Sequence, residues 1–388
     1  TIIRVVHITT VPSTLGFLKG QAAYMRSRGI ELTFVSSEGD GALRRISNDE
    51  GVDHHAVPFV RHLAPKTDIA SIRAVDELVG RLKPDIVHAH TPKAGLAGML
   101  AATRHRTPLR MFHFRGSPAL GRPSAKQRAY AMGERVTCRL ADIVVAIGPT
   151  LLQEVVGRGI CSIGKIRTLP GGMGNGIDIH GRFNPEKFGN EERERLRSSL
   201  GIPPDAPVVL YVGRLSSEKG VDVLWEAWTD LRTRVPEARL LVVGSADARN
   251  PAEKHFLDAM ATDSRVVMPG WVADPRPFYA ISTVLSLPSR REGLANTPLE
   301  AAAMRLPAVV SPSPGCADTV WPGVTGEIAA NPRELADALA RYLTEPARTN
   351  SHGAAARAWV GERCDPTKIW SDLANLYLEG LAESSRVR

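Results

Sequence analysis

The chain has 388 residues, of which 43% are hydrophobic and 23% are charged, and these values are typical of a globular protein with two or three domains. No apolar run reaches the roughly 18 residues that a membrane-spanning helix needs. The four cysteines lie far apart, without the spacing of a metal site or a disulfide framework. The segment TIIRVVHITT is rich in β-branched residues and has no cleavage site, so we interpret it as a strand rather than a signal peptide. We therefore expect a cytoplasmic protein and exclude transmembrane, disulfide-rich and zinc-module classes.

Most of the positive charge lies in the first half of the chain. Residues 1–170 contain 24 Lys and Arg against 13 Asp and Glu, whereas the whole chain has a net charge of +8. This excess suggests an anionic partner, such as a membrane surface, a nucleic acid or a phosphorylated substrate, although a solvated basic face would have the same composition. No acidic residue occurs between Asp85 and Glu134, where eight residues are basic: Lys93, Arg104, Arg106, Arg110, Arg115, Arg122, Lys126 and Arg128.

Short runs rich in Val, Ile and Leu alternate with helical patterns along both halves of the chain. Because these runs are continuously apolar, they favour parallel strands that helices cover on both faces. Between the two series, the segment GGMGNGIDIHGRFNPE indicates a connector, and its glycines lack the GxGxxG spacing of a dinucleotide-binding dehydrogenase. The expected strands are 2–9, 30–37, 85–90, 109–116, 142–148 and 166–170, then 208–215, 238–245, 265–272, 283–289 and 307–313.

This alternation predicts an α/β protein with two doubly wound, Rossmann-like domains that face each other across a cleft. We place the domains at residues 1–180 and 181–366, followed by an amphipathic helix over 367–388. In such sheets, ligands bind beyond the carboxyl ends of the strands, so polar residues at those positions are the first candidates for a site.

Two cations follow the first expected strand of the second half. Arg214 comes directly after Gly213, and Lys219 precedes the next helix. Two cations beside a helix N-terminus form a plausible clamp for a diphosphate, because free N–H groups and the helix dipole favour anions. A surface arginine and an ordinary capping turn are the alternative.

Two carboxylates follow a later strand with seven residues between them. Glu292 lies on a loop that contains Gly293, whereas Glu300 lies within the segment NTPLEAAAM. With Thr297 as N-cap and Pro298 at the first helical position, Glu300 would complete a capping box. The alternative role for Glu300 is to bind vicinal hydroxyl groups, and loop carboxylates at strand ends such as Glu292 are often directed at ligands.

The spacing of Glu292 and Glu300, together with LYVGRLSSEKG, NGID and SPSPG, resembles retaining glycosyltransferases of family 4, which have the GT-B fold. The first half agrees, since HITTVPSTLGF, KPDIVHAHTPKAGLAGMLAA and RLADIVVAIGP resemble the capsule and O-antigen branch of that family. The resemblance covers almost the whole chain. It implies that the first domain binds the acceptor, that the second binds the nucleotide-sugar donor, and that the C-terminal helix packs back on the first domain.

The resemblance also implies a role for individual residues. Arg214 and Lys219 would hold the donor diphosphate, Glu300 the ribose hydroxyls and Glu292 the transferred sugar. The backbone of Gly293 and Leu294 would support the phosphate, Gly16 would approach it from a loop of the first domain, and the Trp271–Val272 region would receive the base. The chain has no DxD-type motif near these positions, and we expect no metal or other cofactor.

One segment departs from the family pattern. Where a His followed by Gly is common, this chain has Phe112-His113-Phe114-Arg115-Gly116. Arg115 takes the usual position of the histidine but cannot act as a base, because its guanidinium is permanently protonated. His113 lies on the same strand face and is either a satisfied core histidine or a contact to substrate.

A second pair of histidines, His88 and His90, lies at the end of another expected strand. Their spacing is that of neighbours on one strand face, and the sequence shows no third residue that would complete a metal site. We expect His90 and Lys93 to line the acceptor side, together with Arg115.

The leading hypothesis is thus a retaining transferase that moves a hexose-type sugar from a nucleotide diphosphate to an acceptor. UDP is the expected nucleotide by family frequency, with GDP as the alternative. The basic first half favours an anionic, lipid-diphosphate-linked glycan at a membrane surface, and it carries no nucleic-acid recognition motif. A nucleotide-sugar epimerase, a transferase with a small soluble acceptor, and a binding protein without catalysis remain alternatives.

Overall fold

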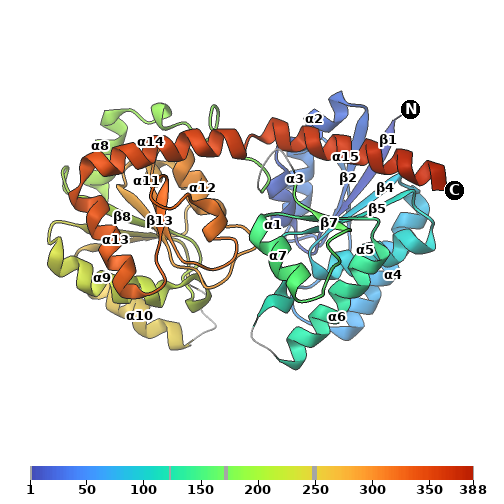
Figure 1. Cartoon of the computed structure of the whole chain (residues 1–388), viewed down its shortest axis with the longest axis horizontal. Helices are drawn as coiled ribbons and strands as arrows, with labels where there is room; N and C mark the ends of the chain where they lie inside the picture. Colours follow the sequence, from blue (N-terminus) through green and yellow to red (C-terminus); the bar gives the residue numbers. More distant parts are fainter. Residues whose placement is uncertain (1, 122–123, 170–173, 247–250, 388) are drawn as a thin grey trace. The chain divides into compact units, whose positions relative to one another are not determined.

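The computed structural model describes residues 2–121, 124–169, 174–246 and 251–387. The chain forms two compact units (Figure 1): unit 1 contains Thr1–Gly176 and Pro366–Arg388, and unit 2 contains Ile177–Asp365. The boundary at Gly176 lies within the segment expected to be a connector, of which residues 171–173 lie outside the described residues.

Unit 1 is built on a seven-stranded parallel sheet with the order β3-β2-β1-β4-β5-β6-β7. The strand order reverses between β1 and β4, which lie side by side although about 80 residues separate them along the chain. The strands are β1 (Ile3–Ile8), β2 (Ile30–Ser36), β3 (Asp53–Ala56), β4 (Ile86–His90), β5 (Leu109–Phe114), β6 (Ile143–Ala146) and β7 (Ile166–Arg167).

Helices cover both faces of this sheet, as the continuously apolar strands require. On one face, α5 (Pro92–Arg104) approaches the strands closely because it has small residues there. A Cβ on Gly95 would lie 2.5 Å from the Phe112 ring, and one on Gly98 would lie 3.0 Å from Ala89. Larger side chains at these two positions would push the helix away from the sheet.

The opposite face is covered by the last helix, α15 (Pro366–Val387), which the chain reaches after completing unit 2 (Figure 1). Trp370 packs beside Tyr24 of α2 (Gln21–Ser27), with ring centroids 5.8 Å apart. Leu373, Tyr377 and neighbouring apolar residues join the buried core beneath the sheet. The amphipathic helix therefore belongs structurally to unit 1.

The remaining elements of unit 1 are helices that connect successive strands. They are α1 (Pro12–Leu15), η1 (Gly16–Leu18), α3 (Ala42–Glu50), α4 (Pro65–Leu82), η2 (Pro118–Leu120), α6 (Ala125–Leu140) and α7 (Pro149–Gly157).

Unit 2 repeats the plan with a six-stranded parallel sheet of order β10-β9-β8-β11-β12-β13. Here the order reverses between β8 and β11. The strands are β8 (Val208–Val212), β9 (Arg239–Val243), β10 (Val266–Gly270), β11 (Val284–Leu287), β12 (Ala308–Val310) and β13 (Gly326–Ile328). The helices are η3 (Pro185–Lys187), α8 (Asn190–Ser199), η4 (Ser217–Lys219), α9 (Val221–Arg234), α10 (Pro251–Thr262), α11 (Arg276–Ala280), α12 (Asn296–Ala303), η5 (Ala317–Thr319), α13 (Pro332–Thr344) and α14 (Pro346–Arg363).

The eleven expected strands all occur, with shorter bounds, and two further strands were not predicted. β3 has the sequence DHHA and contains no large apolar residue, and β13 is only three residues long. Both are outermost strands of their sheets, where burial on two faces is not required. Within the described part of the chain, no helix is long and apolar enough to cross a membrane.

Candidate active site

The predicted residues of unit 2 meet at the point where its strand order reverses. Arg214 and Lys219 follow β8, and Glu292 follows β11, the strand that lies beside β8 in the sheet. Because parallel strands end at one edge, residues more than 70 positions apart in sequence come together there. This edge is where doubly wound sheets bind their ligands.

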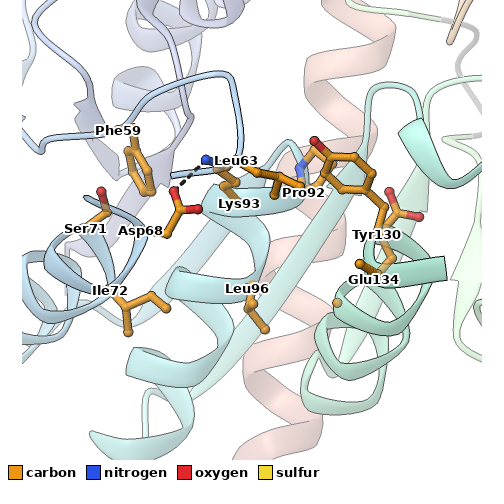
Figure 2. Close-up of a pocket in the computed structure, with 12 residues that line it drawn as sticks. Phe59, Leu63, Asp68, Ser71, Ile72, Pro92, Lys93, Leu96, Tyr130 and Glu134 are labelled. Atoms are coloured by element: carbon orange, nitrogen blue, oxygen red, sulfur yellow. Dashed lines mark hydrogen bonds and ion pairs between the residues drawn. The ribbon is translucent and has the colours of Figure 1, made fainter. Parts of the chain in front are cut away.

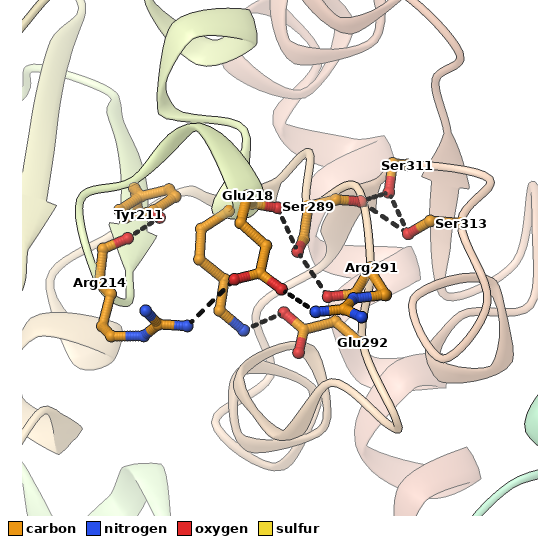
Figure 3. A network of polar contacts seen from close by, with 9 residues as sticks. Tyr211, Arg214, Glu218, Ser289, Arg291, Glu292, Ser311 and Ser313 are labelled. Carbon is orange, nitrogen blue, oxygen red and sulfur yellow. Dashed lines mark hydrogen bonds and ion pairs between the residues drawn. The ribbon is translucent and has the colours of Figure 1, made fainter. Parts of the chain in front are cut away.

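The charged side chains at this edge form alternating ion pairs (Figure 3). Arg214 Nη2 lies 3.5 Å from Glu218 Oε2, and Arg291 Nη2 lies 2.6 Å from the other oxygen of Glu218. Lys219 Nζ lies 2.5 Å from Glu292 Oε1. Burial raises the pKa of Glu218, but its hydrogen bond with Arg291 and the surrounding cations outweigh burial and lower it. Three cations therefore face two carboxylates, which leaves a net positive charge of +1 at the edge.

The loops that carry these charges are fixed by close backbone contacts. Gly220 has a φ of +73°, and a Cβ there would lie 1.9 Å from the carbonyl oxygen of Pro288. The hydroxyl of Ser289 donates to the Glu218 carbonyl at 3.2 Å, and Ser313 Oγ donates to the Ser289 carbonyl at 2.6 Å (Figure 3). The turn after β8 and the loop after β11 are thus joined directly.

The capping box expected at Glu300 is wrong. Helix α12 begins at Asn296 with Ala295 as its N-cap residue, so Thr297 and Pro298 lie inside the helix and not at its boundary. The Glu300 carboxylate instead accepts a hydrogen bond of 2.9 Å from the hydroxyl of Tyr279 in α11. Burial raises the pKa of Glu300, although the Tyr279 hydroxyl and the nearby Arg182 oppose that rise. The Glu300 carboxylate is thus bound to α11 through Oε2, and its other oxygen accepts no hydrogen bond among the residues that the structure describes.

The other predicted residues of unit 2 follow β10 or lie on the loop after β11. Trp271, directly after β10, has 73% of its surface exposed, whereas Leu294 is buried beside Gly293. Gly315 has a φ of +74°, and a Cβ on it would lie 2.7 Å from the Gly293 carbonyl oxygen. The SPSPG turn therefore packs directly against the loop that carries Glu292. Val272 follows Trp271 and is partly buried.

In unit 1, four histidines line up beneath α15 near the reversal of strand order. His7 of β1 pairs in register with His88 of β4, and His90 of β4 pairs with His113 of β5. All four are buried. Burial and the Arg115 guanidinium lower the pKa of His7 to about 3. Burial also lowers the pKa values of the other three well below the usual range, so all four rings are neutral at pH 7.

The direction of each hydrogen bond in this row follows from Arg115, which can only donate. Its Nε lies 3.2 Å from His90 Nδ1, so that nitrogen accepts, and His90 Nε2–H donates to His7 Nδ1 at 2.9 Å. His7 Nε2–H then donates to the Tyr377 hydroxyl at 3.3 Å, and this hydroxyl donates to His88 Nδ1 at 2.6 Å. A single chain of hydrogen bonds thus joins Arg115 to helix α15.

These contacts revise three sequence-based expectations. The sequence showed no third partner for His88 and His90, but His7 supplies one, and the three rings have nitrogens within 4.8 Å of one another. Two of these rings, His7 and His90, have both nitrogens hydrogen-bonded within the row, whereas the buried Nε2 of His88 has no partner among the described residues. His90 is fully buried beneath Arg115, so it does not itself line an open surface. His113 is a core residue, and neither of its ring nitrogens has a partner among the described residues.

Arg115 is the polar group at the outer end of this row. Burial lowers its pKa to about 10, so it stays charged at neutral pH. Its Nη1 donates to Asn175 Oδ1 in the NGID segment, and its Nε donates to His90.

Gly16 does not lie in a loop as expected, because α1 follows β1 and Gly16 begins the short helix η1. A Cβ on Gly16 would meet no atom of the protein within 4 Å.

The basic stretch of unit 1 is partly neutralised by carboxylates from other segments. Lys93 lies 2.5 Å from Asp68, Arg104 lies 3.5 Å from Asp76, and Arg110 lies 2.5 Å from Asp142. Of the remaining cations, Lys126 and Arg128 are exposed on α6, and Arg122 lies outside the described residues. The positive field of this stretch is therefore weaker than the lack of acidic residues between Asp85 and Glu134 suggests.

Two family profiles match the two halves of the chain. Residues 17–172 match the glycosyl transferase 4-like domain, and residues 206–345 match glycosyl transferases group 1. Together they cover most of both units. The chain is a family 4 glycosyltransferase with the GT-B fold.

Individual relatives agree with this assignment. The glycosyltransferase is 28% identical over 386 residues to the capsular polysaccharide biosynthesis glycosyltransferase CapM of Staphylococcus aureus, with 98% of each chain covered. It is also 28% identical to a D-inositol 3-phosphate glycosyltransferase of Xylanimonas cellulosilytica, covering 78% of this chain and 73% of that one.

Solved structures confirm the fold of the glycosyltransferase. A glycosyltransferase from Rickettsia africae matches with a TM-score of 0.81 at 19% identity, covering 98% of this chain and 99% of that one. Anabaena HepE in complex with UDP and glucose matches with a TM-score of 0.77 at 18% identity, covering 97% and 100%. At these identities the likeness concerns the fold alone.

Several residues of the candidate site and of the histidine row were not singled out from the sequence. Glu218 directly precedes Lys219 and Arg291 directly precedes Glu292, so their positions in the sequence could have identified them as candidates. His7 stands at the end of the first strand, as His88 and His90 do on theirs, and that parallel could also have been noticed. Tyr377 had no signal, because nothing in an amphipathic helix shows which polar group its buried face will meet.

Proposed function

We propose that this glycosyltransferase moves a hexose-type sugar from a UDP-sugar to a glycan acceptor, with retention of the anomeric configuration. The observation that carries the proposal is the convergence of Arg214, Lys219 and Arg291 at the edge where β8 and β11 end. Cations at this edge suit a diphosphate, whose charge increases when the sugar leaves. The UDP bound to the structurally similar HepE supports uridine as the nucleoside.

The two glutamates have different surroundings, which supports different roles. The Glu300 carboxylate is partly buried and fixed by Tyr279, as suits a bidentate contact to the ribose hydroxyls. The Glu292 carboxylate is paired with Lys219, so it lies next to the group that we assign to the diphosphate. A sugar attached to that diphosphate would meet Glu292 first. We assign the backbone of Gly293 and Leu294 to the phosphate and the Trp271–Val272 region to the base.

Calorimetric titration with UDP tests these assignments. Replacing Arg214 or Lys219 by Ala removes a charged hydrogen bond and should weaken UDP binding by about 1–3 kcal/mol. Glu300→Gln should weaken it as well, because ribose contacts are independent of the sugar. Glu292→Gln should not weaken it, because the carboxylate competes with the diphosphate for Lys219, but it should lower sugar transfer.

Arg290→Ala is the matched control, since Arg290 lies on the same loop but pairs with Asp222, 2.5 Å away. It should bind UDP as the unmodified protein does. Equal loss of UDP affinity in Glu292→Gln and Glu300→Gln, or unchanged affinity in both Arg214→Ala and Lys219→Ala, would contradict the assignments.

For the acceptor we propose a lipid-diphosphate-linked glycan, bound by unit 1 at an anionic membrane surface during assembly of a surface polysaccharide. The similarity to CapM over the whole chain supports the polysaccharide. Support for the membrane contact comes from α6, where Lys126 and Arg128 are exposed near the exposed apolar residues Met132 and Val136. Basic residues near an anionic surface contribute up to about 1 kcal/mol each, and apolar side chains can insert.

Co-sedimentation with phosphatidylglycerol-containing vesicles tests the membrane contact. Binding should require the anionic lipid and should decline as salt increases, because salt screens the attraction. The double variant Lys126→Glu and Arg128→Glu should lose binding, whereas Lys187→Glu and Arg195→Glu, the same charge change in unit 2, should retain it. Salt-insensitive or absent vesicle binding, together with efficient transfer to a neutral soluble acceptor, would contradict the lipid-linked acceptor and support the soluble-acceptor alternative.

A further inference from the structure

Unit 1 contains a cavity of about 160 Å³ between three helices and the segment before them (Figure 2). Its walls come from α4, α5, α6 and the segment that precedes α4. Apolar side chains form most of the lining, including Phe59, Leu96 and the ring of Tyr130. An ion pair between Lys93 and Asp68, 2.5 Å apart, stands on one side, and Glu134 stands on the other (Figure 2).

Part of this cavity exists because residue 133 is a glycine. Gly133 lies within α6 in an ordinary helical conformation, where any other residue except proline would stabilise the helix. A Cβ at this position would meet no atom of the protein within 4 Å. Neither backbone conformation nor packing therefore requires the glycine, and its effect is to leave the cavity open.

One of the two carboxyl oxygens of Glu134 has no hydrogen-bond partner among the described residues. The residue is 1% exposed, and its Oε2 accepts a hydrogen bond of 2.6 Å from Ser117. Its Oε1 has no partner among the residues that the structure describes. A buried oxygen without a donor is unfavourable, and a bound molecule with an N–H or O–H group would satisfy this atom.

The lining restricts what that molecule can be. Two carboxyls against one ammonium group disfavour a phosphate or any other anion, and a pure hydrocarbon would leave Glu134 Oε1 unpaired. The volume is close to that of an engineered cavity of about 150 Å³ that holds benzene, a single six-membered ring. Aromatic walls and few polar groups are typical of sites for small neutral ligands. The observations together fit a neutral six-membered ring that carries hydroxyl or amide groups.

We propose that this cavity binds one neutral pyranose ring of the acceptor glycan, with Glu134 Oε1 accepting a hydrogen bond from a ring hydroxyl or an N-acetyl N–H. The ring's C–H face would pack on Phe59 and Tyr130, and Lys93 and Asp68 would meet its outer hydroxyls. This inference rests on the proposed function, because it takes the bound sugar to be part of the acceptor.

Saturation-transfer NMR with a panel of neutral methyl pyranosides tests the proposal directly. The panel contains the glucoside, galactoside, mannoside and rhamnoside and the N-acetylated glucosaminide and galactosaminide. At least one should bind the unmodified protein, and Gly133→Leu should weaken that binding at least tenfold by filling the cavity. This variant favours folding, since leucine is a better helix former than glycine.

Gly157→Leu is the matched control, because Gly157 is also helical and open but lies in α7, away from the cavity. It should bind the glycoside normally. Glu134→Met keeps the volume of the side chain but removes the oxygen, and it should weaken the same glycoside. If no glycoside binds, or if Gly133→Leu binds as tightly as Gly157→Leu, the inference is overturned.

UDP binding separates this result from the proposed function. All three variants should keep the UDP affinity of the unmodified protein, because we assign the donor to unit 2. If no glycoside binds in the cavity but the protein still consumes a nucleotide sugar, only the proposal that the cavity binds the acceptor is overturned. Glycoside binding without consumption of any nucleotide sugar would overturn the assignment of that sugar as an acceptor, together with the proposed function.

Discussion

Burial controls the charge of individual residues in unit 1, and Glu134 shows this most directly. Burial raises the pKa of its carboxyl to about 7, although the hydrogen bond from Ser117 opposes the rise. In the unfolded chain the same carboxyl titrates near its ordinary value of 4.5. Between these values the folded protein holds the proton more tightly than the unfolded chain, so folding stability falls as the pH rises.

The stability of the protein should therefore depend on pH through Glu134. The loss between pH 4.5 and pH 7 follows from the shift in pKa and is about 3 kcal/mol. Glu134→Gln cannot ionise, so its melting temperature relative to the unmodified protein should be higher at pH 8 than at pH 5. Thermal melts of both proteins at the two pH values measure this difference. An equal difference at both would show that Glu134 ionises as an exposed carboxyl does.

At the scale of whole elements, helix α15 is tied to Arg115 by the row of hydrogen bonds through Tyr377. Removing the Tyr377 hydroxyl would leave His7 Nε2–H without an acceptor and His88 Nδ1 without a donor. Each unpaired buried group costs about 1–3 kcal/mol. We propose that Arg115 contacts the acceptor, as the family resemblance implies, and we assign Tyr377, His7, His88 and His90 as positioning residues that act through it.

Tyr377→Phe should accordingly lower kcat while leaving the UDP dissociation constant unchanged, because we assign UDP to unit 2. Tyr24→Phe is the control, since Tyr24 also contacts α15 but its ring packs on Trp370, outside the row. Steady-state kinetics together with UDP titration make the comparison. If both variants reduce kcat equally, the effect belongs to the packing of α15 and not to Arg115.

Elements were more predictable than contacts between them. The central strands of both sheets are continuous apolar runs, so their periodicity alone located them. β3 and β13 lack such runs because they are edge strands, and the start of α12 was misplaced because Thr-Pro-Leu-Glu satisfies a capping rule that the fold does not use. Local sequence rules describe a segment's preference, and tertiary packing overrides that preference where it conflicts.

The same limit applies to the candidate site. Arg214, Lys219, Glu292 and Glu300 could be named because they stand at strand ends in recognisable motifs. Their pairing could not be predicted, since the contact between Lys219 and Glu292 joins segments 73 residues apart. Glu134 and Tyr377 had no sequence signal at all, because the tertiary structure determines which partners a buried polar group has.

At the scale of the whole molecule, the chain divides its chemistry between two units. Unit 2 gathers paired cations and carboxylates at one sheet edge. Unit 1 holds a row of neutral imidazoles, a charged arginine and an apolar cavity. The first suits an anionic leaving group and the second a largely neutral sugar, which is the division that a transferase needs.

Donor consumption and product configuration test the central claim most directly. The intact protein is incubated with UDP- and GDP-sugars and a lipid-diphosphate-linked glycan, and one- and two-dimensional NMR follows the anomeric signals. We predict that a UDP-sugar is consumed, that UDP is released, and that the new linkage keeps the anomeric configuration of the donor. Formation of an epimer, inversion of the configuration, or binding without consumption of any nucleotide sugar would contradict the account.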